Sequence, residues 1–514
     1  MPSANETTGA AMPQDLAFPV EDFRTRAPAA GTPRPFRLPP VQAFTLPSGI
    51  AVYLVEQHAL PLVSIDLNFD GGAAVDPPGK EGLASVCMAM LTEGTTQLDK
   101  LAYAERLADT ASSIGGYAGD DSVGLTLSSL ARHMDATFAQ FVDTLREPGF
   151  RASDFDRMIR RRIEGVRQSK GSPASVAARV SGTVLYGPDH PFGTAVTEAS
   201  LAAISLDDCR AFAHAWLRPE GARLFVVGDV TQAQLRAWFD SSYPSGRLAG
   251  WTGAAPEPPP LPAPRRMPGR ICFVDIPGAT QSTVSYLQFG PPRTAPDYFA
   301  TTLLGAVFGG GFTSRLNMNL REDKGYSYGA RGNFSYTRAY GVFAATAQVT
   351  GRSTYQAILE IDREVRALAS GVPERAVTSD ELSRERNAAI LGLPARFATA
   401  QGALGQYRGL VYFGLPLDYY NGYVEQVSRV SHADIAAAAS AHLAPDRAVY
   451  VVVGNGDEPV IARVADAAGV RDLPYAPDGV QLTLRDALAT LAARGDVGGG
   501  GLVELDTDGR PASR

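Results

Sequence analysis

The sequence of 514 residues has few cysteines, no long apolar run and no excess of positive charge. Its three cysteines, Cys87, Cys209 and Cys272, are far apart and form no Cys-x-x-Cys pair, so neither a disulfide framework nor a thiolate metal site is indicated. No apolar run reaches the roughly 18–20 residues that span a bilayer, so we expect no membrane span. With 47 Lys+Arg against 54 Asp+Glu, the net charge of −7 gives no basic field for nucleic acid.

Histidine is also scarce. None of the six histidines stands three or four residues from another, so the sequence offers no helical pair of metal ligands. They are His58, His133, His190, His214, His432 and His442.

Residues 1–16 contain neither a basic segment nor an apolar one, as a secretory signal would, which predicts a cytoplasmic protein. The alternative is a periplasmic protein with an unconventional signal or a different start.

Proline and small polar residues divide the chain into parts. Residues 1–44 lack any sustained period and predict an extended N-terminal arm. Residues 246–268 predict a stiff linker, because proline supports neither helix nor central strand. Its prolines are Pro256, Pro258, Pro259, Pro260, Pro262, Pro264 and Pro268. Two domains then occupy residues 45–245 and 269–470. Residues 471–514 form a C-terminal tail, partly disordered, whose last dozen residues we expect to lack structure.

An internal repeat relates the two domains. The segment Ser205–Asp229 aligns without gaps on Ser431–Asn455, at an offset of 226 residues. Each copy reads as a helix, a turn with proline and a buried strand that ends in glycine. The halves are therefore predicted to share one duplicated fold.

Further patterns predict the fold class of each half. Residues 50–55 and 62–69 look like paired strands, and residues 271–274, 283–289 and 341–349 are strand-like. Apolar residues from Tyr355 to Leu368 follow helical spacing, and Thr378 with Glu381 resembles a capping box that opens a further helix. We predict an α+β fold: two tandem homologous domains, each a mostly antiparallel sheet covered by helices.

The most specific motif begins at Gly309. It reads Gly-Gly-Gly-x-x-Ser-Arg-Leu, followed by Leu-Arg-Glu-x-x-Gly-x-x-Tyr, and ends at Tyr328. The duplicated layout agrees with it, with Leu46-Pro-Ser-Gly near the start and Val226-Val-Gly-Asp at the end of the first repeat. Over about residues 45–465 the chain resembles the pitrilysin/insulinase (inverted-zincin) peptidases.

The resemblance also shows what is missing. Active members of the family carry His-x-x-Glu-His on a helix of the first half, where the histidines bind zinc and the glutamate acts as general base. Here Ser85, Met88 and Ala89 stand at these degenerate zinc-site positions. A methyl group cannot bind zinc and a thioether cannot accept the proton. A third ligand would fall near Glu164 or Gly165, and Glu164 is more simply a surface carboxylate. We expect no zinc, no other cofactor and no catalytic residue in this chain.

The resemblance implies a role for the second half. In the family an arginine and a tyrosine, seven residues apart, contact the peptide at the zinc site, and Arg321 and Tyr328 match them. Such a pair can orient a peptide and stabilise oxyanion charge. The structural alternative is a salt bridge at Arg321 and strand packing at Tyr328. Gly309, Gly310 and Gly311 either let a helix start tightly or let the substrate backbone approach.

A group of basic residues on one predicted helix has two interpretations. It is either a solvated helix face or an anion-attracting wall of a substrate chamber. Its members are Arg157, Arg160, Arg161, Arg162, Arg167 and Lys170.

The function that follows is an expectation. The family includes two-chain enzymes in which one subunit brings zinc and the other brings the Arg/Tyr motif. We expect this chain to be the non-catalytic, substrate-binding subunit of such a heterodimer, inactive alone, with a zinc-bearing homologous subunit as partner and a peptide as substrate. The alternative is a non-enzymatic scaffold or core subunit of a larger assembly.

Overall fold

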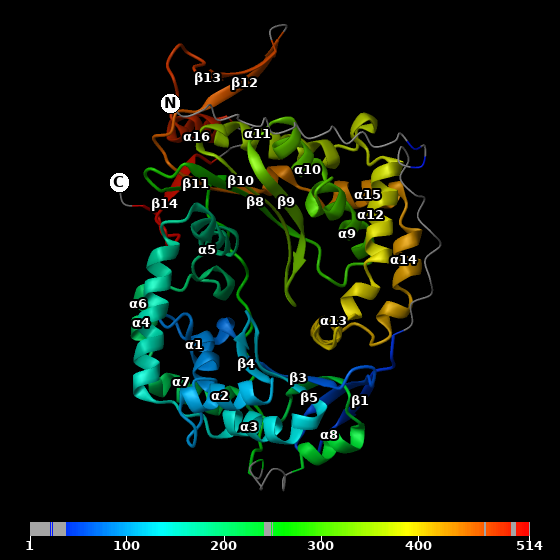
Figure 1. The fold of residues 1–514 in the computed structure, drawn as a ribbon. Coiled ribbons are helices and arrows are strands. Elements are labelled where there is room, and N and C mark those ends of the chain that lie inside the picture. Colours follow the sequence, from blue (N-terminus) through cyan, green and yellow to red (C-terminus); the bar gives the residue numbers. More distant parts are fainter. Residues whose placement is uncertain are drawn as a thin grey trace, which may run out of the picture. The chain divides into compact units, whose positions relative to one another are not determined.

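The computed structural model describes residues 21, 23, 38–240, 248, 250–466, 469–494 and 500–512. The chain divides into two units, residues 1–35 and residues 36–514. Most of the predicted N-terminal arm lies outside the described residues. Everything below concerns the second unit, whose fold is drawn in Figure 1.

The first half contains one six-stranded sheet. Its strands are β1 (Gln42–Thr45), β2 (Ala51–Glu56), β3 (Leu62–Asp70), β4 (Ser113–Ala118), β5 (Ser122–Leu130) and β6 (Arg223–Gly228). They lie in the order β1-β2-β6-β3-β5-β4, and only β2 and β6 are parallel neighbours. The predicted pairing of residues 50–55 with 62–69 is wrong, because β6 returns from the end of the repeat and lies between β2 and β3.

The second half repeats this topology except at its edge strand, β14, which is parallel to β7 whereas β1 is antiparallel to β2. Its strands are β7 (Ile271–Asp275), β8 (Gln281–Gly290), β9 (Ser327–Tyr336), β10 (Gly341–Thr350), β11 (Val449–Gly454) and β14 (Leu502–Leu505). Their order is β14-β7-β11-β8-β10-β9, with β11 between β7 and β8 as β6 lies between β2 and β3. A separate hairpin pairs β12 (Ile461–Asp466) with β13 (Gly469–Pro474).

The C-terminal segment completes the second sheet. We expected the last dozen residues to lack structure, but β14 pairs in parallel with β7, and Leu505 is buried. Glycine-rich, polar sequence hid this short strand, which is ordered by the edge that β7 offers.

Helices cover both sheets. In the first half they are α1 (Leu83–Leu91), α2 (Lys100–Asp109), α3 (Met134–Arg146), α4 (Ala152–Ser169), α5 (Pro173–Tyr186), α6 (Glu198–Ala203), α7 (Leu206–Trp216) and α8 (Gln232–Trp238). In the second half they are α9 (Tyr298–Gly305), α10 (Arg315–Asn317), α11 (Thr354–Ala369), α12 (Ser379–Leu391), α13 (Ala400–Tyr412), α14 (Tyr423–Arg429), α15 (His432–His442) and α16 (Leu484–Ala493). The α+β prediction with two tandem domains is confirmed.

The internal repeat appears as two matching helix-and-strand units. Ser205 caps α7 and Ser431 caps α15, and each serine accepts the amide of the aspartate three residues on, in a reciprocal capping box. The strands that follow, β6 and β11, begin and end at positions 226 residues apart. The same local sequence signals therefore build the same unit twice.

The two halves exchange one helix each. Helix α5 packs on β8 and β11 of the second sheet, where Val176, Val180 and Val184 share a buried cluster with Val451 and Val453. Helix α13 packs on β3 and β6 of the first sheet. Each sheet is thus covered in part by a helix from the other half (Figure 1).

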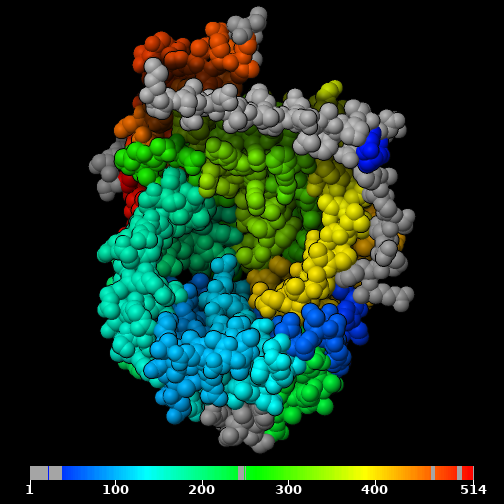
Figure 2. Space-filling model, in the orientation of Figure 1, coloured from blue at the N-terminus to red at the C-terminus, as the bar shows by residue number. Residues whose placement is uncertain are grey.

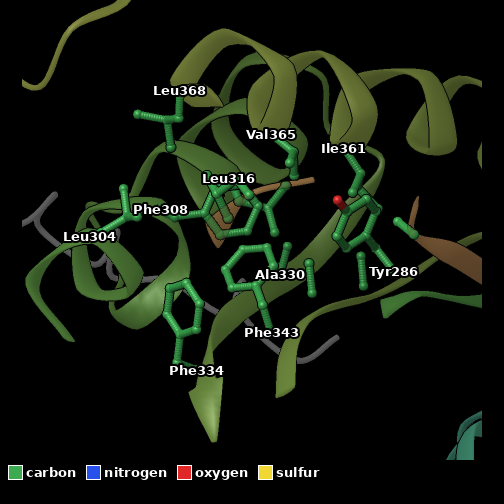
Figure 3. Close-up of a cluster of buried hydrophobic side chains, with 14 of the residues drawn as sticks. Tyr286, Leu304, Phe308, Leu316, Ala330, Phe334, Phe343, Ile361, Val365 and Leu368 are labelled. Atoms are coloured by element: carbon green, nitrogen blue, oxygen red, sulfur yellow. The ribbon is translucent and has the colours of Figure 1, made fainter. Parts of the chain in front are cut away.

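A dense apolar core supports the second half (Figure 3). It joins the sheet, through Tyr286 and Phe343, to Ile361 and Val365 of α11 and to Phe308, all fully buried. Burying each such side chain contributes roughly 1.5–3 kcal/mol. Phe308 precedes the glycine motif directly, so the motif is anchored in this core.

No helix within the described ranges is both long and apolar enough to cross a membrane.

Candidate functional site

Helix α1 carries the three degenerate positions of the zinc site, Ser85, Met88 and Ala89. Ser85 and Ala89 are the partly exposed residues of α1, one turn apart, whereas the other seven residues are buried. Met88 is 1% exposed, and its carbonyl oxygen lies 2.2 Å from the position that a Cβ on Gly116 would take. The helix therefore turns one narrow stripe of small side chains away from the core.

Arg162 of α4 occupies this stripe. Its guanidinium donates to the Ser85 hydroxyl at 2.9 Å and to the Ser85 carbonyl at 3.1 Å. Glu164, near the predicted third-ligand position, has a side chain that is 57% exposed and lies 3.5 Å from Arg167, while Gly165 faces open space. A hydroxyl bound to arginine, a thioether and a methyl group do not form a zinc ligand set. Among the described residues, no group of three or more His, Cys, Asp or Glu side chains is placed to hold a metal ion.

Asp76 fixes the start of α1. Its carboxylate accepts the amides of Gly82 at 2.7 Å and Ala84 at 2.8 Å, at the end of the helix that favours negative charge. Burial raises the pKa of this carboxyl to about 6, although the backbone hydrogen bonds act against the rise. The scaffold of the zinc helix is therefore kept although its ligands are absent.

Arg321 and Tyr328 lie on neighbouring segments of the second half. Arg321 belongs to a π-helical turn, Met318–Asp323, and Tyr328 to the start of β9. The Arg321 guanidinium lies 4.9 Å from the ring centroid of Phe312, and its ion pair is with adjacent Glu322 at 3.2 Å. Tyr328 is 87% exposed and Phe312 is 57% exposed. The salt bridge of the structural alternative is thus present at Arg321, but an ion pair between two exposed neighbours contributes little to stability. Tyr328 lies in a strand without packing in the core.

The rest of the motif holds this exposed pair in place. Leu316 and Leu320 are fully buried. Arg315 binds both carboxylate oxygens of Glu381, which opens α12 in the predicted capping box. Burial alone would raise the pKa of Glu381, but the hydrogen bonds from Arg315 and Thr378 lower it to about 2. The first arginine of the motif, Arg315, therefore has a structural role.

Asn317 connects the glycine segment to β9, a role that the sequence did not reveal. Its amide nitrogen donates to the Phe312 carbonyl at 2.6 Å, and its oxygen accepts the Ala330 amide at 3.2 Å. Asn317 is 4% exposed. A buried polar residue between Arg315 and Leu316 on one side and Arg321 on the other was the available signal, since such a residue needs partners.

The three glycines differ in what they require. A Cβ on Gly309 would lie 2.2 Å from the Gly332 nitrogen, so Gly309 lets its segment touch β9. A Cβ on Gly310 would lie 3.3 Å from the Ala306 Cβ, and one on Gly311 would meet no atom within 4 Å. Close packing explains Gly309, and Gly311 has room for an approaching backbone.

The basic residues of α4 do not act as one surface. Arg157 pairs with Glu93 and Asp154, and Lys170 pairs with Glu198 and Asp508. Arg160, Arg161 and Arg167 are exposed, as the solvated-face interpretation expects, and Arg162 turns towards α1. Part of the charge is therefore neutralised locally.

Charged residues also join the halves, which the sequence did not predict. Asp66 of β3 is fully buried, and Arg408 of α13 donates to it at 2.8 Å. Tyr412 of α13 donates to Asp121 at 2.8 Å. These contacts border a cavity of about 400 Å³ lined by residues of both halves. Figure 2 shows the surface of residues 36–514 hollowed between teal atoms of the first half and yellow atoms of the second.

Two models of one peptidase family match the sequence. The model "Insulinase (Peptidase family M16)" matches residues 51–184, and the model "Peptidase M16 inactive domain" matches residues 203–388. The chain belongs to the insulinase (M16) peptidase family. The two matches coincide with the α1 half and with the segment that runs into the Arg/Tyr half, so the resemblance in the motifs is confirmed.

Some similar proteins are described as zinc proteases, and another is described as a non-peptidase homolog. A Helicobacter pylori protein described as "Non-peptidase homolog YmxG" is 24% identical over 420 residues, covering 79% of this chain and 92% of that protein. A Bacillus subtilis protein described as "Uncharacterized zinc protease YmxG" is 19% identical and covers 67% of this chain and 82% of that protein. Similarity at this level supports the family but does not transfer an activity.

Solved structures share the fold. A Pseudomonas fluorescens structure described as a "peptidase M16 inactive domain" superposes with a TM-score of 0.72 at 24% identity, covering 81% of this chain and 98% of that one. A Helicobacter pylori structure described as a protease gives a TM-score of 0.70 at 17% identity, with 81% and 100% covered.

Proposed function

We propose that this M16 chain is the non-catalytic, substrate-binding subunit of a two-chain zinc peptidase. A homologous partner would supply zinc and the general base, and this chain would supply Arg321 and Tyr328 to the bound peptide. The name "non-peptidase homolog" of a relative and the replaced ligands on α1 both support a chain that does not hydrolyse peptides alone.

One observation carries the proposal. Tyr328 is 87% exposed, whereas Leu316 and Leu320 of the same motif are fully buried and Arg315 is ion-paired with Glu381. Tyr328 is exposed, and on the contacting segment Arg321 lies over the exposed ring of Phe312. Exposed aromatic side chains of this kind are typical of a binding surface and would suit a peptide. The guanidinium can donate to a peptide carbonyl, and the phenol can donate to developing oxyanion charge.

The test is peptidase activity on a library of unmodified peptides. The chain is assayed alone, with a zinc-bearing family member encoded beside it, and as that pair with Arg321→Ala or Tyr328→Phe. Removal of one charge-assisted donor should lower kcat about 10- to 100-fold. The matched control is Arg352→Ala, because Arg352 is also exposed, at 58%, and lies outside the motif.

The outcomes separate the two functions that the sequence left open. If only the pair cleaves peptides, and the two motif variants slow turnover while the pair stays intact, the substrate-binding role holds. If the partner is equally active without this chain, the scaffold or core-subunit function replaces it.

A further inference from the structure

Arg162 is a cation without an acidic partner at the site where the family holds zinc. No Asp or Glu in the described part of the chain forms an ion pair with it, unlike Arg157 on the same helix and Lys170 at the helix C-cap. Its hydrogen bonds go to the Ser85 hydroxyl and carbonyl, which use two of the five guanidinium N–H groups. Burial and the neighbouring Arg161 lower the pKa of Arg162, yet an arginine stays charged at neutral pH.

The surroundings leave this cation accessible. Ser85 and Ala89 are the partly exposed positions of α1, and both have small side chains. The Ser85 hydroxyl accepts a hydrogen bond from Arg162, so its own proton is available to a second acceptor. A partly buried guanidinium that lacks a counter-charge is unfavourable until an anion pairs with it.

We propose that Ser85 and Arg162 bind a carboxylate of the peptide substrate, either its C-terminus or an acidic side chain, at the position where active members hold zinc. The planar guanidinium matches the two oxygens of a carboxylate, and the serine hydroxyl can donate to one of them. Loss of the metal would then have turned a hydrolytic site into a binding site. The inference rests on the proposed function, which it deepens by naming the substrate class.

Paired peptides test the proposal. Fluorescence anisotropy measures the affinity of the full chain, alone and with its zinc-bearing partner, for four labelled peptides of one length. Two differ only in a free or amidated C-terminus, and two only in an internal Glu or Gln. The carboxylate form of one pair should bind at least about tenfold more tightly, since a charge-assisted contact is stronger than a neutral one. The pair that shows this preference identifies which carboxylate is recognised.

Single-residue variants test whether Arg162 and Ser85 cause the preference for the carboxylate peptide. Arg162→Gln should abolish it, Ser85→Ala should reduce it, and Arg162→Lys should keep part of it. Arg160→Gln is the matched control, because Arg160 is exposed on the same helix and should change nothing. Circular dichroism checks the fold of each variant, and the Lys variant keeps the test valid if the Gln variant is unstable.

Two results would contradict the carboxylate site alone, and a third would also contradict the proposed function. Equal affinity for charged and neutral peptides, or an equal loss in the Arg160 and Arg162 variants, contradicts the carboxylate site and leaves the proposed function standing. If no peptide binds to the wild-type chain or to the pair, both the carboxylate site and the substrate-binding function are wrong.

Discussion

Asp66 is a buried carboxylate whose charge is compensated by one arginine from the other half of the chain. Arg408 and Tyr117 both donate to its carboxylate, at 2.8 and 2.9 Å. Burial raises the pKa of Asp66, and Arg408 opposes that rise. A carboxyl whose folded pKa lies above its unfolded value weakens the fold most at high pH and is relieved as the pH falls through the folded pKa.

Arg408→Gln should therefore lower the free energy of unfolding by about 2–4 kcal/mol at pH 7.5, because it leaves Asp66 charged and unpaired. The loss should shrink at pH 5, as the further raised pKa lets Asp66 take up a proton. Urea denaturation at both pH values measures it. The double variant Asp66→Asn/Arg408→Gln should recover most of the loss at pH 7.5. A constant loss at both pH values would contradict the account.

At the scale of the element, the packing of the glycine segment before α10 against β9 requires Gly309 but not Gly311. Gly309→Ala should destabilise the chain by about 1–3 kcal/mol, because the methyl group collides with the Gly332 backbone and displaces β9. Gly311→Ala should keep the wild-type unfolding free energy within about 0.5 kcal/mol, because the site is open. If Gly311 admits the substrate backbone, its variant should still raise KM of the pair.

Thermal unfolding and peptidase kinetics of the two variants provide the measurements. A Gly309 variant as stable as the wild type would show that the contact with β9 is not needed. A Gly311 variant with unchanged KM would favour a structural role for all three glycines.

Local elements were readable from the sequence because their signals are local. The internal repeat predicted helices at α7 and α15, and the Thr378–Glu381 box predicted α12. The replaced zinc ligands were also visible in the sequence, because the family resemblance fixes their positions on α1. The pairing of β2 with β3 was predicted wrongly because strand order depends on a distant segment, β6.

Contacts between distant segments could not be read in this way. Arg162 was one of several basic residues on a helix, and only the packing of α4 beside α1 brings it to Ser85. Asp66 looked like a polar residue in a strand, although Arg408 reaches it from 342 positions away. Arg321 and Tyr328 were found from the family motif, but their exposure is a property of the fold.

For the whole molecule, the exchange of α5 and α13 predicts that the halves hold together without the linker. Residues 256–260 of the linker are exposed, so a protease site inserted between Pro258 and Pro259 should be cut readily. The two fragments should then elute together in gel filtration without denaturant, because each sheet keeps a buried helix from the other fragment. Separate elution of the fragments would contradict the exchange.

The central claim is that position 328 touches the peptide in the pair, and photo-crosslinking tests it most directly. A photoreactive phenylalanine replaces Tyr328 in one chain and Val480, which is 68% exposed, in a control chain. Each chain is mixed with its zinc-bearing partner and a labelled peptide, illuminated and analysed for labelled adducts. We predict an adduct from position 328 that requires the partner and is suppressed by unlabelled peptide, with none from position 480. Equal labelling from both positions, or none from 328 while the pair cleaves the peptide, would contradict the account.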